Sequence, residues 1–139
     1  MPGKLLLEVV TPEKLLLSQE VDEVIAPGSE GEFGVLPGHC HFLSTLKIGE
    51  LRYRVGDTMN HMSVLWGFAE VTPQKVTILA EIAEKAEDID VERAQAAVEK
   101  AQRRLDVGGL PSELKEAQIS LEKARLRKRI AERAKQRTR

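Results

Sequence analysis

The run Pro27-Gly28-Ser29-Glu30-Gly31-Glu32-Phe33-Gly34-Val35-Leu36-Pro37-Gly38-His39 divides a region of short apolar segments. It holds four glycines and two prolines. Glycine adopts backbone angles that are closed to other residues, and proline fixes its own φ while removing a hydrogen-bond donor. The composition therefore predicts a shaped, ordered surface feature set between strands rather than a flexible linker.

Segments typical of β-strands lie on both sides of this run, from Lys4 to about Glu84. Pairs such as Thr11-Pro12, Gly56-Asp57 and Thr72-Pro73 are typical of turns and separate the segments. With no helical stretch among them, we expect up to about ten strands in an antiparallel β-sandwich. The clearest strand-like runs are Leu5–Val10, Val21–Ile25, Leu51–Val55 and Val76–Leu79.

The period of the apolar residues changes at Asp88, and a helical pattern begins. Asp90 is placed to cap a first helix, and Val107-Gly108-Gly109-Leu110-Pro111 ends it. Ser112 is a candidate cap for a second helix. The apolar stripes of the two helices are Ala94, Val98, Ala101 and Leu105, and Leu114, Ala117, Leu121 and Ala124. Leu126 and Ile130 lie off the main stripe, where they could rest on the sandwich or on another protein.

These patterns predict a mainly β, α+β chain with two domains. Residues 1–86 form an antiparallel β-sandwich, and residues 87–139 form an antiparallel α-helical hairpin. Alanines bury little area, so at roughly 25 cal/mol per Å² their seam contributes only a few kcal/mol. We expect a hairpin of marginal stability that is able to detach.

The distribution of charge also differs between the two parts. Residues 112–139 carry ten lysines and arginines against four glutamates, whereas residues 1–88 carry about twice as many carboxylates as cations. The whole chain of 139 residues has a formal net charge of −1. An acidic first part and a basic second part predict two modules with different partners.

Several classes of protein are disfavoured by composition. No apolar run approaches the roughly 20 residues that cross a bilayer, and Leu5-Leu6-Leu7 is too short for a signal-peptide core. The single cysteine, Cys40, excludes an internal disulfide and fits a reducing cytoplasm. Aromatic residues are 4% of the chain, and the cations of the last helix alternate with Ala, Leu and Glu, which favours an acidic protein partner over nucleic acid.

Enzymatic chemistry and metal binding are also disfavoured. No serine has a Gly-x-Ser-x-Gly setting, and the glycine-rich run lacks the Gly-Lys-Ser/Thr ending of a phosphate-binding loop. His39, Cys40, His41 and His61 could supply metal ligands, but adjacent strand residues point to opposite faces. We predict turn and interface packing for the first three, and no catalytic residue.

The hexapeptide Ile89-Asp90-Val91-Glu92-Arg93-Ala94 allows two interpretations. It is a helix start with a capping aspartate and a surface arginine. Alternatively, the cap, the arginine and a facing helix rich in cations could hold a triphosphate nucleotide between them.

Several motifs together resemble the epsilon subunit of bacterial F-type ATP synthases. They are Val9-Val10-Thr11-Pro12, the Gly28–His39 signature, Gly67-Phe68-Ala69-Glu70-Val71, Ala83–Asp90 and the Ile-Asp-x-x-Arg-Ala hexapeptide, and they span nearly the whole chain. The resemblance implies a β-sandwich followed by a helical hairpin. It also implies a non-catalytic rotor component, peripheral to the cytoplasmic face of the cell inner membrane, that couples proton flow to ATP synthesis.

The resemblance further implies contact surfaces for each partner. Glu30, Gly31 and Glu32 would touch the c ring. The residues that would contact the gamma subunit are His39, Cys40, His41, Phe42, Leu43, Ser44 and Thr45. The extended hairpin would reach the catalytic beta (and alpha) subunits through Arg125, Lys128 and Arg129, and so inhibit ATP hydrolysis.

Some members of the family bind regulatory ATP on the folded hairpin, and no cofactor is required. The matching positions are Glu84, Ile89, Asp90, Arg93, Ala94, Lys100, Lys123 and Arg127. Lys100 and Lys123 stand where those relatives have arginines, and Trp66 stands where the first glycine of a pair is usual. The alternative is a β-sandwich and coiled-coil adaptor outside the ATP synthase, with RNA as a conceivable ligand.

Overall fold

The computed structural model describes residues 4–137, with side chains described as far as residue 134. The chain divides into two compact units between Lys85 and Ala86. The first unit is built from strands and the second from helices, as predicted. Each unit is described by itself.

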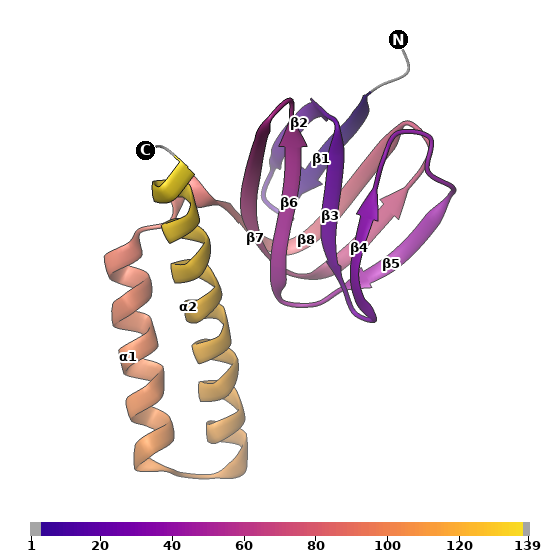
Figure 1. The fold of residues 1–139 in the computed structure, drawn as a ribbon. Helices are drawn as coiled ribbons and strands as arrows, with labels where there is room; N and C mark the ends of the chain where they lie inside the picture. The colour runs from indigo at the N-terminus through magenta and orange to yellow at the C-terminus, as the bar shows by residue number, and fades with distance from the viewer. Residues whose placement is uncertain (1–3, 138–139) are drawn as a thin grey trace. The chain divides into compact units, whose positions relative to one another are not determined.

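Eight strands form the β-sandwich of the first unit (Figure 1). They are β1 (Leu5–Val10), β2 (Leu15–Val21), β3 (Glu23–Gly28), β4 (Gly31–Val35), β5 (Phe42–Leu46), β6 (Gly49–Val55), β7 (Thr58–Val71) and β8 (Lys75–Lys85). Their order is β2-β1-β8-β7-β5-β3-β4, and β6 pairs with both β3 and β7. The eight strands in the described residues fall within the expected maximum of about ten, and their number is lower because β7 and β8 are long continuous strands.

One pairing departs from the predicted antiparallel arrangement. β1 and β8 run parallel, with Val9 opposite Ile78 and Val10 opposite Leu79. β1 is the first strand of the unit and β8 is the last. Because no tight hairpin joins them, they are not forced to run antiparallel. The inner face holds a continuous apolar core whose fully buried members include Leu5, Leu7 and Leu51.

The long strand β7 bends near its middle. Its first half pairs with β6 and its second half with β5, while β8 pairs with both halves. The apolar core contains Met62 and Val64 from before the bend but Ala69 and Val71 from after it, so the side chains that face the core change from even to odd positions. Trp66 lies at this change with a φ of 48°, in the left-handed region. Such irregularities let a strand pass from one layer of a sandwich to another.

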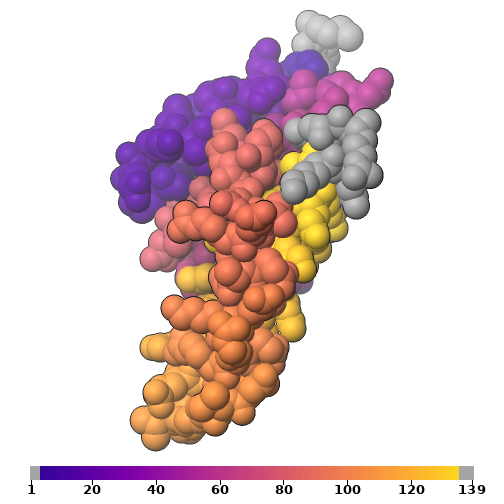
Figure 2. All heavy atoms as spheres, turned by 90° about the vertical axis from the view of Figure 1, so that its left-hand side faces the viewer, coloured from indigo at the N-terminus to yellow at the C-terminus, as the bar shows by residue number. Residues whose placement is uncertain are grey.

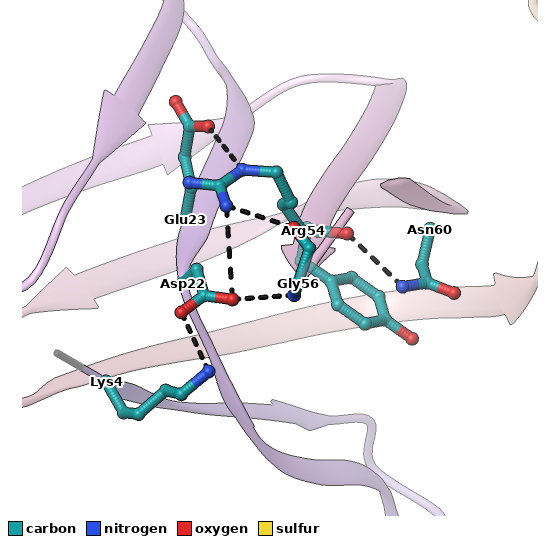
Figure 3. Close-up of polar contacts among 7 residues, drawn as sticks. Lys4, Asp22, Glu23, Arg54, Gly56 and Asn60 are labelled. Carbon is teal, nitrogen blue, oxygen red and sulfur yellow. Dashed lines mark hydrogen bonds and ion pairs between the residues drawn. The ribbon is translucent and has the colours of Figure 1, made fainter. Parts of the chain in front are cut away.

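The predicted strand Val21–Ile25 is wrong, because Asp22 separates β2 from β3. The carboxylate of Asp22 accepts hydrogen bonds from Lys4 Nζ at 2.8 Å and from the backbone N–H of Gly56 at 2.7 Å (Figure 3). The Lys4 hydrogen bond, the Gly56 N–H and the charges of Lys4 and Arg54 lower the pKa of Asp22. Neither Lys4 nor Gly56 is close to Asp22 in sequence, so the local pattern could not predict this break.

Residues 27–35 of the glycine-rich run lie in the β3–β4 hairpin, and residues 36–39 follow β4 outside the strands. Pro27 and Gly28 end β3, Ser29-Glu30 forms the turn, and Gly31–Val35 is β4. The prediction of an ordered feature is confirmed. The prediction that the run lies between strands is wrong for Pro27, Gly28 and Gly31–Val35, because these residues are themselves part of β3 and β4. Gly31 has a φ of 134°, which a residue with a side chain rarely adopts, and this explains a glycine directly after the turn.

The second unit is the predicted helical hairpin. It contains a short 3-10 helix, η1 (Ala86–Asp88), and the antiparallel helices α1 (Val91–Val107) and α2 (Pro111–Arg137). The helices pack side by side, and in Figure 2 α1 faces the viewer while parts of α2 are visible behind it. Asp90 caps α1 as predicted, because its Oδ1 accepts from the N–H of Arg93 at 3.1 Å. Gly108, with a φ of 84°, follows its last residue.

The predicted cap of the second helix was wrong. α2 begins at Pro111, so Ser112 lies inside its first turn. Proline is favoured at the first helical position, and Glu113 Oε1 accepts from the N–H of Leu110 at 2.9 Å, which satisfies a donor in front of the helix. The predicted alanine seam is confirmed. Its most buried members are Ala94, Ala101, Ala117 and Ala124, and Leu126 and Ile130 are buried as well.

Candidate functional site

The tip of the β3–β4 hairpin carries the three residues expected at the c ring. Glu30 lies in the exposed turn, and Gly31 and Glu32 begin β4. Glu32 is exposed, but its Oε2 accepts from Arg52 Nη2 on β6 at 2.7 Å. Arg52 therefore neutralises part of the acidic charge at this tip, a contact that the sequence did not reveal.

The seven residues expected at gamma form one stretch, His39–Thr45. His39, Cys40 and His41 precede β5, and the other four belong to that strand. Leu43 is 71% exposed and Phe42 is 41% exposed, although the Phe42 ring lies 5.1 Å from the ring of Phe33 in an edge-to-face contact. Large exposed apolar side chains on a strand are typical of a surface that contacts a partner.

A direct hydrogen bond links these two candidate surfaces. Thr45 Oγ1 on β5 donates to Ser29 Oγ in the β3–β4 turn at 2.7 Å, and the N–H of Ser29 donates to the Thr45 carbonyl at 2.9 Å. The structure thus brings together two sets of residues that the sequence placed only in separate motifs.

An apolar groove of about 670 Å³ lies beside β5 and was not predicted. It is bounded by the end of β1, by β5 and by the bend of β7 and β8. Its lining includes Pro12, Thr45, Trp66, Phe68 and Leu79. The one sequence signal for this groove was Trp66, which stands where the family resemblance implies the first glycine of a pair.

The positions matched to ATP binding are spread over several elements. Glu84 lies near the end of β8 in the first unit, whereas Ile89 and Asp90 precede α1. The remaining five lie on the two helices, with Arg93, Ala94 and Lys100 on α1 and Lys123 and Arg127 on α2. Because the helices are antiparallel, Arg93 and Arg127 lie toward the same end of the hairpin, and Lys100 lies nearer to its turn.

A cavity of about 360 Å³ lies at the turn end of the hairpin. Lys100, Arg103 and Arg104 line it together with Glu113. Arg103 and Arg104 were not among the sequence-predicted residues. Asp90 is already engaged as the cap of α1, and Ala94 is fully buried, so these two positions fit a structural role in the hairpin.

The three cations expected at the beta subunits lie on α2. Arg125 and Arg129 are exposed, and Lys128 is half-buried. Because positions 125 and 129 are four residues apart, they share one face of the helix.

Cys40 is exposed, and its Sγ lies 3.8 Å from His39 Nδ1. Within the described residues, no three His, Cys, Asp or Glu side chains are grouped so that they could hold a metal ion. A separate search of the same residues found no helix with the length and apolar character needed to cross a membrane.

Comparison with known proteins agrees with this two-part architecture. Residues 4–86 match the family model described as ATP synthase, Delta/Epsilon chain, beta-sandwich domain. Residues 87–132 match ATP synthase, Delta/Epsilon chain, long alpha-helix domain. The fold and both matches thus define a delta/epsilon-type subunit of an ATP synthase, which is a non-catalytic class of protein.

Whole-chain relatives narrow this class. The chain is 54% identical over 132 residues to the ATP synthase epsilon chain of Syntrophobacter fumaroxidans, covering 95% of this chain and 98% of that one. It is 50% identical over 137 residues to the epsilon chain of Citrifermentans bemidjiense, covering 96% and 98%. We conclude that the chain belongs to the ATP synthase epsilon chain family, which excludes the adaptor alternative.

A solved structure has the same fold. A chain in the Euglena gracilis mitochondrial ATP synthase, determined as OSCP/F1/c-ring in rotational state 1, superposes with a TM-score of 0.79 at 26% identity. The match covers 90% of this chain and 79% of that chain.

Proposed function

We propose that this chain is a rotor subunit that joins the gamma subunit to the c ring and thereby couples proton flow to ATP synthesis on other subunits. It associates peripherally with the cytoplasmic face of the cell inner membrane, through the complex. Membership in the epsilon chain family supports this function, as does the assembly of F1 and c-ring to which the Euglena gracilis relative belongs.

The observation that carries the proposal is the adjacency of two exposed surfaces on one sandwich. The acidic β3–β4 turn, with Glu30, Gly31 and Glu32, is assigned to the c ring. The stretch His39–Thr45, with Leu43 most exposed, is assigned to gamma. The Thr45–Ser29 hydrogen bond and the backbone pairing of β3 with β5 place the two surfaces on one folded sheet.

Rebinding to an enzyme stripped of its epsilon subunit tests this assignment. Leu43→Glu places a charge on an apolar contact and is expected to weaken rebinding at least tenfold, equivalent to about 1.4 kcal/mol. Leu110→Glu, on a residue that is 65% exposed at the hairpin turn, is the matched control and is expected to bind normally. Equal rebinding of the two variants would refute the assignment.

We further propose that the hairpin is a conformational brake on ATP hydrolysis. Its small alanine seam allows two arrangements of similar energy, and the cations Arg125, Lys128 and Arg129 suit acidic loops of the beta (and alpha) subunits. A chain ending at Lys85 is expected to raise hydrolysis by the assembled enzyme without loss of assembly. Reversing the three charges in the full chain should do the same, and unchanged hydrolysis in both variants would contradict the brake.

Regulatory ATP binding on the hairpin is a separate proposal. It is supported by the hexapeptide and by Arg93 and Arg127, which lie toward the same end of the two helices. Lysine lacks the bidentate fork of arginine, so Lys100 and Lys123 should give weaker binding than arginines would. Titration calorimetry of the full chain with Mg-ATP is expected to show binding at millimolar concentration or below, which Arg127→Ala weakens. The absence of both heat and thermal stabilisation would remove the proposal.

A further inference from the structure

The cavity at the turn end of the hairpin is lined mainly by charged side chains. It lies where α1 runs into the turn that leads to α2 (Figure 1), and its volume is about 360 Å³. Lys100, Arg103 and Arg104 of α1 line it, and Glu113 stands on the α2 side. Cavities that hold small molecules range from about 300 to 1,000 Å³, so this one suits a compact ligand.

The three cations lie on one side of α1. Residues three and four positions apart are neighbours on a helix surface, so Lys100 is next to both Arg103 and Arg104. Like charges at this spacing repel each other and destabilise a helix. Among the described residues, no carboxylate forms an ion pair with any of the three. The repulsion between them is therefore not offset by an ion pair within the described part of the hairpin.

The nearby carboxylates are engaged elsewhere. Glu99 Oε2 accepts from Gln95 Nε2 at 3.1 Å, and Asp106 Oδ1 accepts from Gln102 Nε2 at 3.1 Å. Glu113 Oε1 accepts from a backbone N–H of the turn at 2.9 Å. With three cations and one carboxylate, the cavity lining has a net charge of +2, which attracts an anion.

The helix dipole explains only part of this arrangement. Cations in the last turn of a helix are stabilised by the partial negative charge of its C-terminus, and Arg104 stands there. The effect falls off within that turn, whereas Lys100 lies about two turns before Val107, the last residue of α1. A binding role accounts for all three cations around one cavity, whereas the dipole accounts for one.

We infer that this cavity binds a compact phosphate-type oxyanion with two or more negative charges, such as inorganic pyrophosphate. An arginine guanidinium donates two parallel hydrogen bonds to a phosphate group, and a lysine adds a point charge. Arg103 and Arg104 supply two guanidinium groups, and Lys100 supplies the ammonium group. The bound anion offsets the repulsion between the cations and stabilises α1 next to the turn.

This site is distinct from the regulatory ATP site proposed above, and it goes beyond the proposed function. Arg93 and Arg104 are separated by roughly 16 Å along the axis of α1. Arg127 lies toward the Arg93 end, and Lys100 is the one residue common to both sets. Free pyrophosphate and the phosphate chain of a nucleotide offer the same chemistry, so the test includes both.

The test is titration calorimetry of the full chain with inorganic pyrophosphate and, separately, with Mg-ATP, at constant ionic strength. Pyrophosphate is expected to bind at one site with a dissociation constant of about 1 mM or below. Arg103→Gln and Arg104→Gln should each weaken this binding by at least about tenfold, and circular dichroism checks that both variants stay helical. Lys115→Gln removes the same charge from an exposed residue of α2 outside the cavity lining, and it should bind pyrophosphate as the native chain does.

The outcomes decide both the site and the source of its ligand. Equal binding by Arg104→Gln and Lys115→Gln, or no binding of pyrophosphate by the native chain, would overturn the inference. A loss in Arg127→Ala as large as that in Arg104→Gln would place the anion at the other end of the hairpin and would overturn it as well. If Arg104→Gln weakens Mg-ATP as strongly as pyrophosphate, the ligand is the phosphate chain of a nucleotide, and if Mg-ATP binding is unchanged, the ligand is a free oxyanion. The rotor assignment is tested separately by rebinding, so it stands or falls independently of these results.

Discussion

Replacing Gly67 by alanine should be among the most damaging single substitutions in the sandwich. Gly67 follows Trp66 at the bend of β7 and has a φ of 151°. A Cβ built on it would lie 1.8 Å from the carbonyl oxygen of Leu79 and 2.9 Å from the Cα of Ala80. Both atoms belong to the backbone of β8, so no side-chain rotation can relieve the contact.

The expected cost follows from the movement that the methyl group would force. A carbon–oxygen separation near 3.3 Å requires β7 and β8 to separate locally by about 1.5 Å. That displacement breaks or strains about two ladder hydrogen bonds, each contributing about 0.5–1.5 kcal/mol, and positive φ adds about 1 kcal/mol for alanine. The total is about 2–4 kcal/mol, or a fall of at least about 8 °C in the thermal midpoint of a domain of this size.

Gly56→Ala supplies the matched control. Gly56 also has a positive φ, 60°, but an added Cβ there would meet nothing within 4 Å. Only the cost of placing alanine at a positive φ remains, so Gly56→Ala should lower the free energy of unfolding by about 1 kcal/mol. Urea unfolding followed by far-UV circular dichroism measures both variants without relying on fluorescence from the neighbouring Trp66. A difference below about 1 kcal/mol between the variants would show that the bend is softer than this reasoning requires.

Three further substitutions probe the caps, charges and seam. Asp90→Ala should cost about 1 kcal/mol of stability through loss of the α1 cap, while Asp90→Asn retains most of it; helical circular dichroism during urea unfolding compares them. Because its folded pKa lies below the ordinary 3.8, Asp22 stabilises the fold above that pH, and the contribution is lost as pH falls through the lowered pKa. Asp22→Asn should therefore lower the thermal midpoint at pH 7 but not in strong acid, and an equal deficit at both would contradict the linkage. Ala101→Leu should cost about 1–3 kcal/mol by overpacking the helical seam, where Ala101 is 3% exposed, and no loss in calorimetry would mean that the seam is loose.

Sequence motifs, rather than charge or composition, carried most of the functional interpretation. The glycine-rich signature and the hexapeptide were specific enough for family resemblance, and the family is confirmed. The residues proposed for gamma, the c ring, the beta subunits and ATP remain proposals. The sequence could not show that Thr45 bonds to Ser29 or that Arg52 pairs with Glu32, because each contact joins separate strands.

The sequence by itself determined the helical hairpin. Helix hydrogen bonds and caps join residues three or four apart, so Asp90, Gly108 and the spacing of the alanines were sufficient signals. The cap of α2 was missed because serine was preferred over Pro111, whose fixed φ suits the first helical position.

Only the tertiary structure decided how the strands are arranged. Sheet hydrogen bonds join residues that are distant in sequence, so the parallel β1–β8 pair and the break at Asp22 follow from partners elsewhere in the chain. The bend at Trp66 arises because one strand pairs with two neighbours in different layers. The apolar groove beside β5 exists only once the strands are paired, since its lining is scattered from Val10 to Glu81.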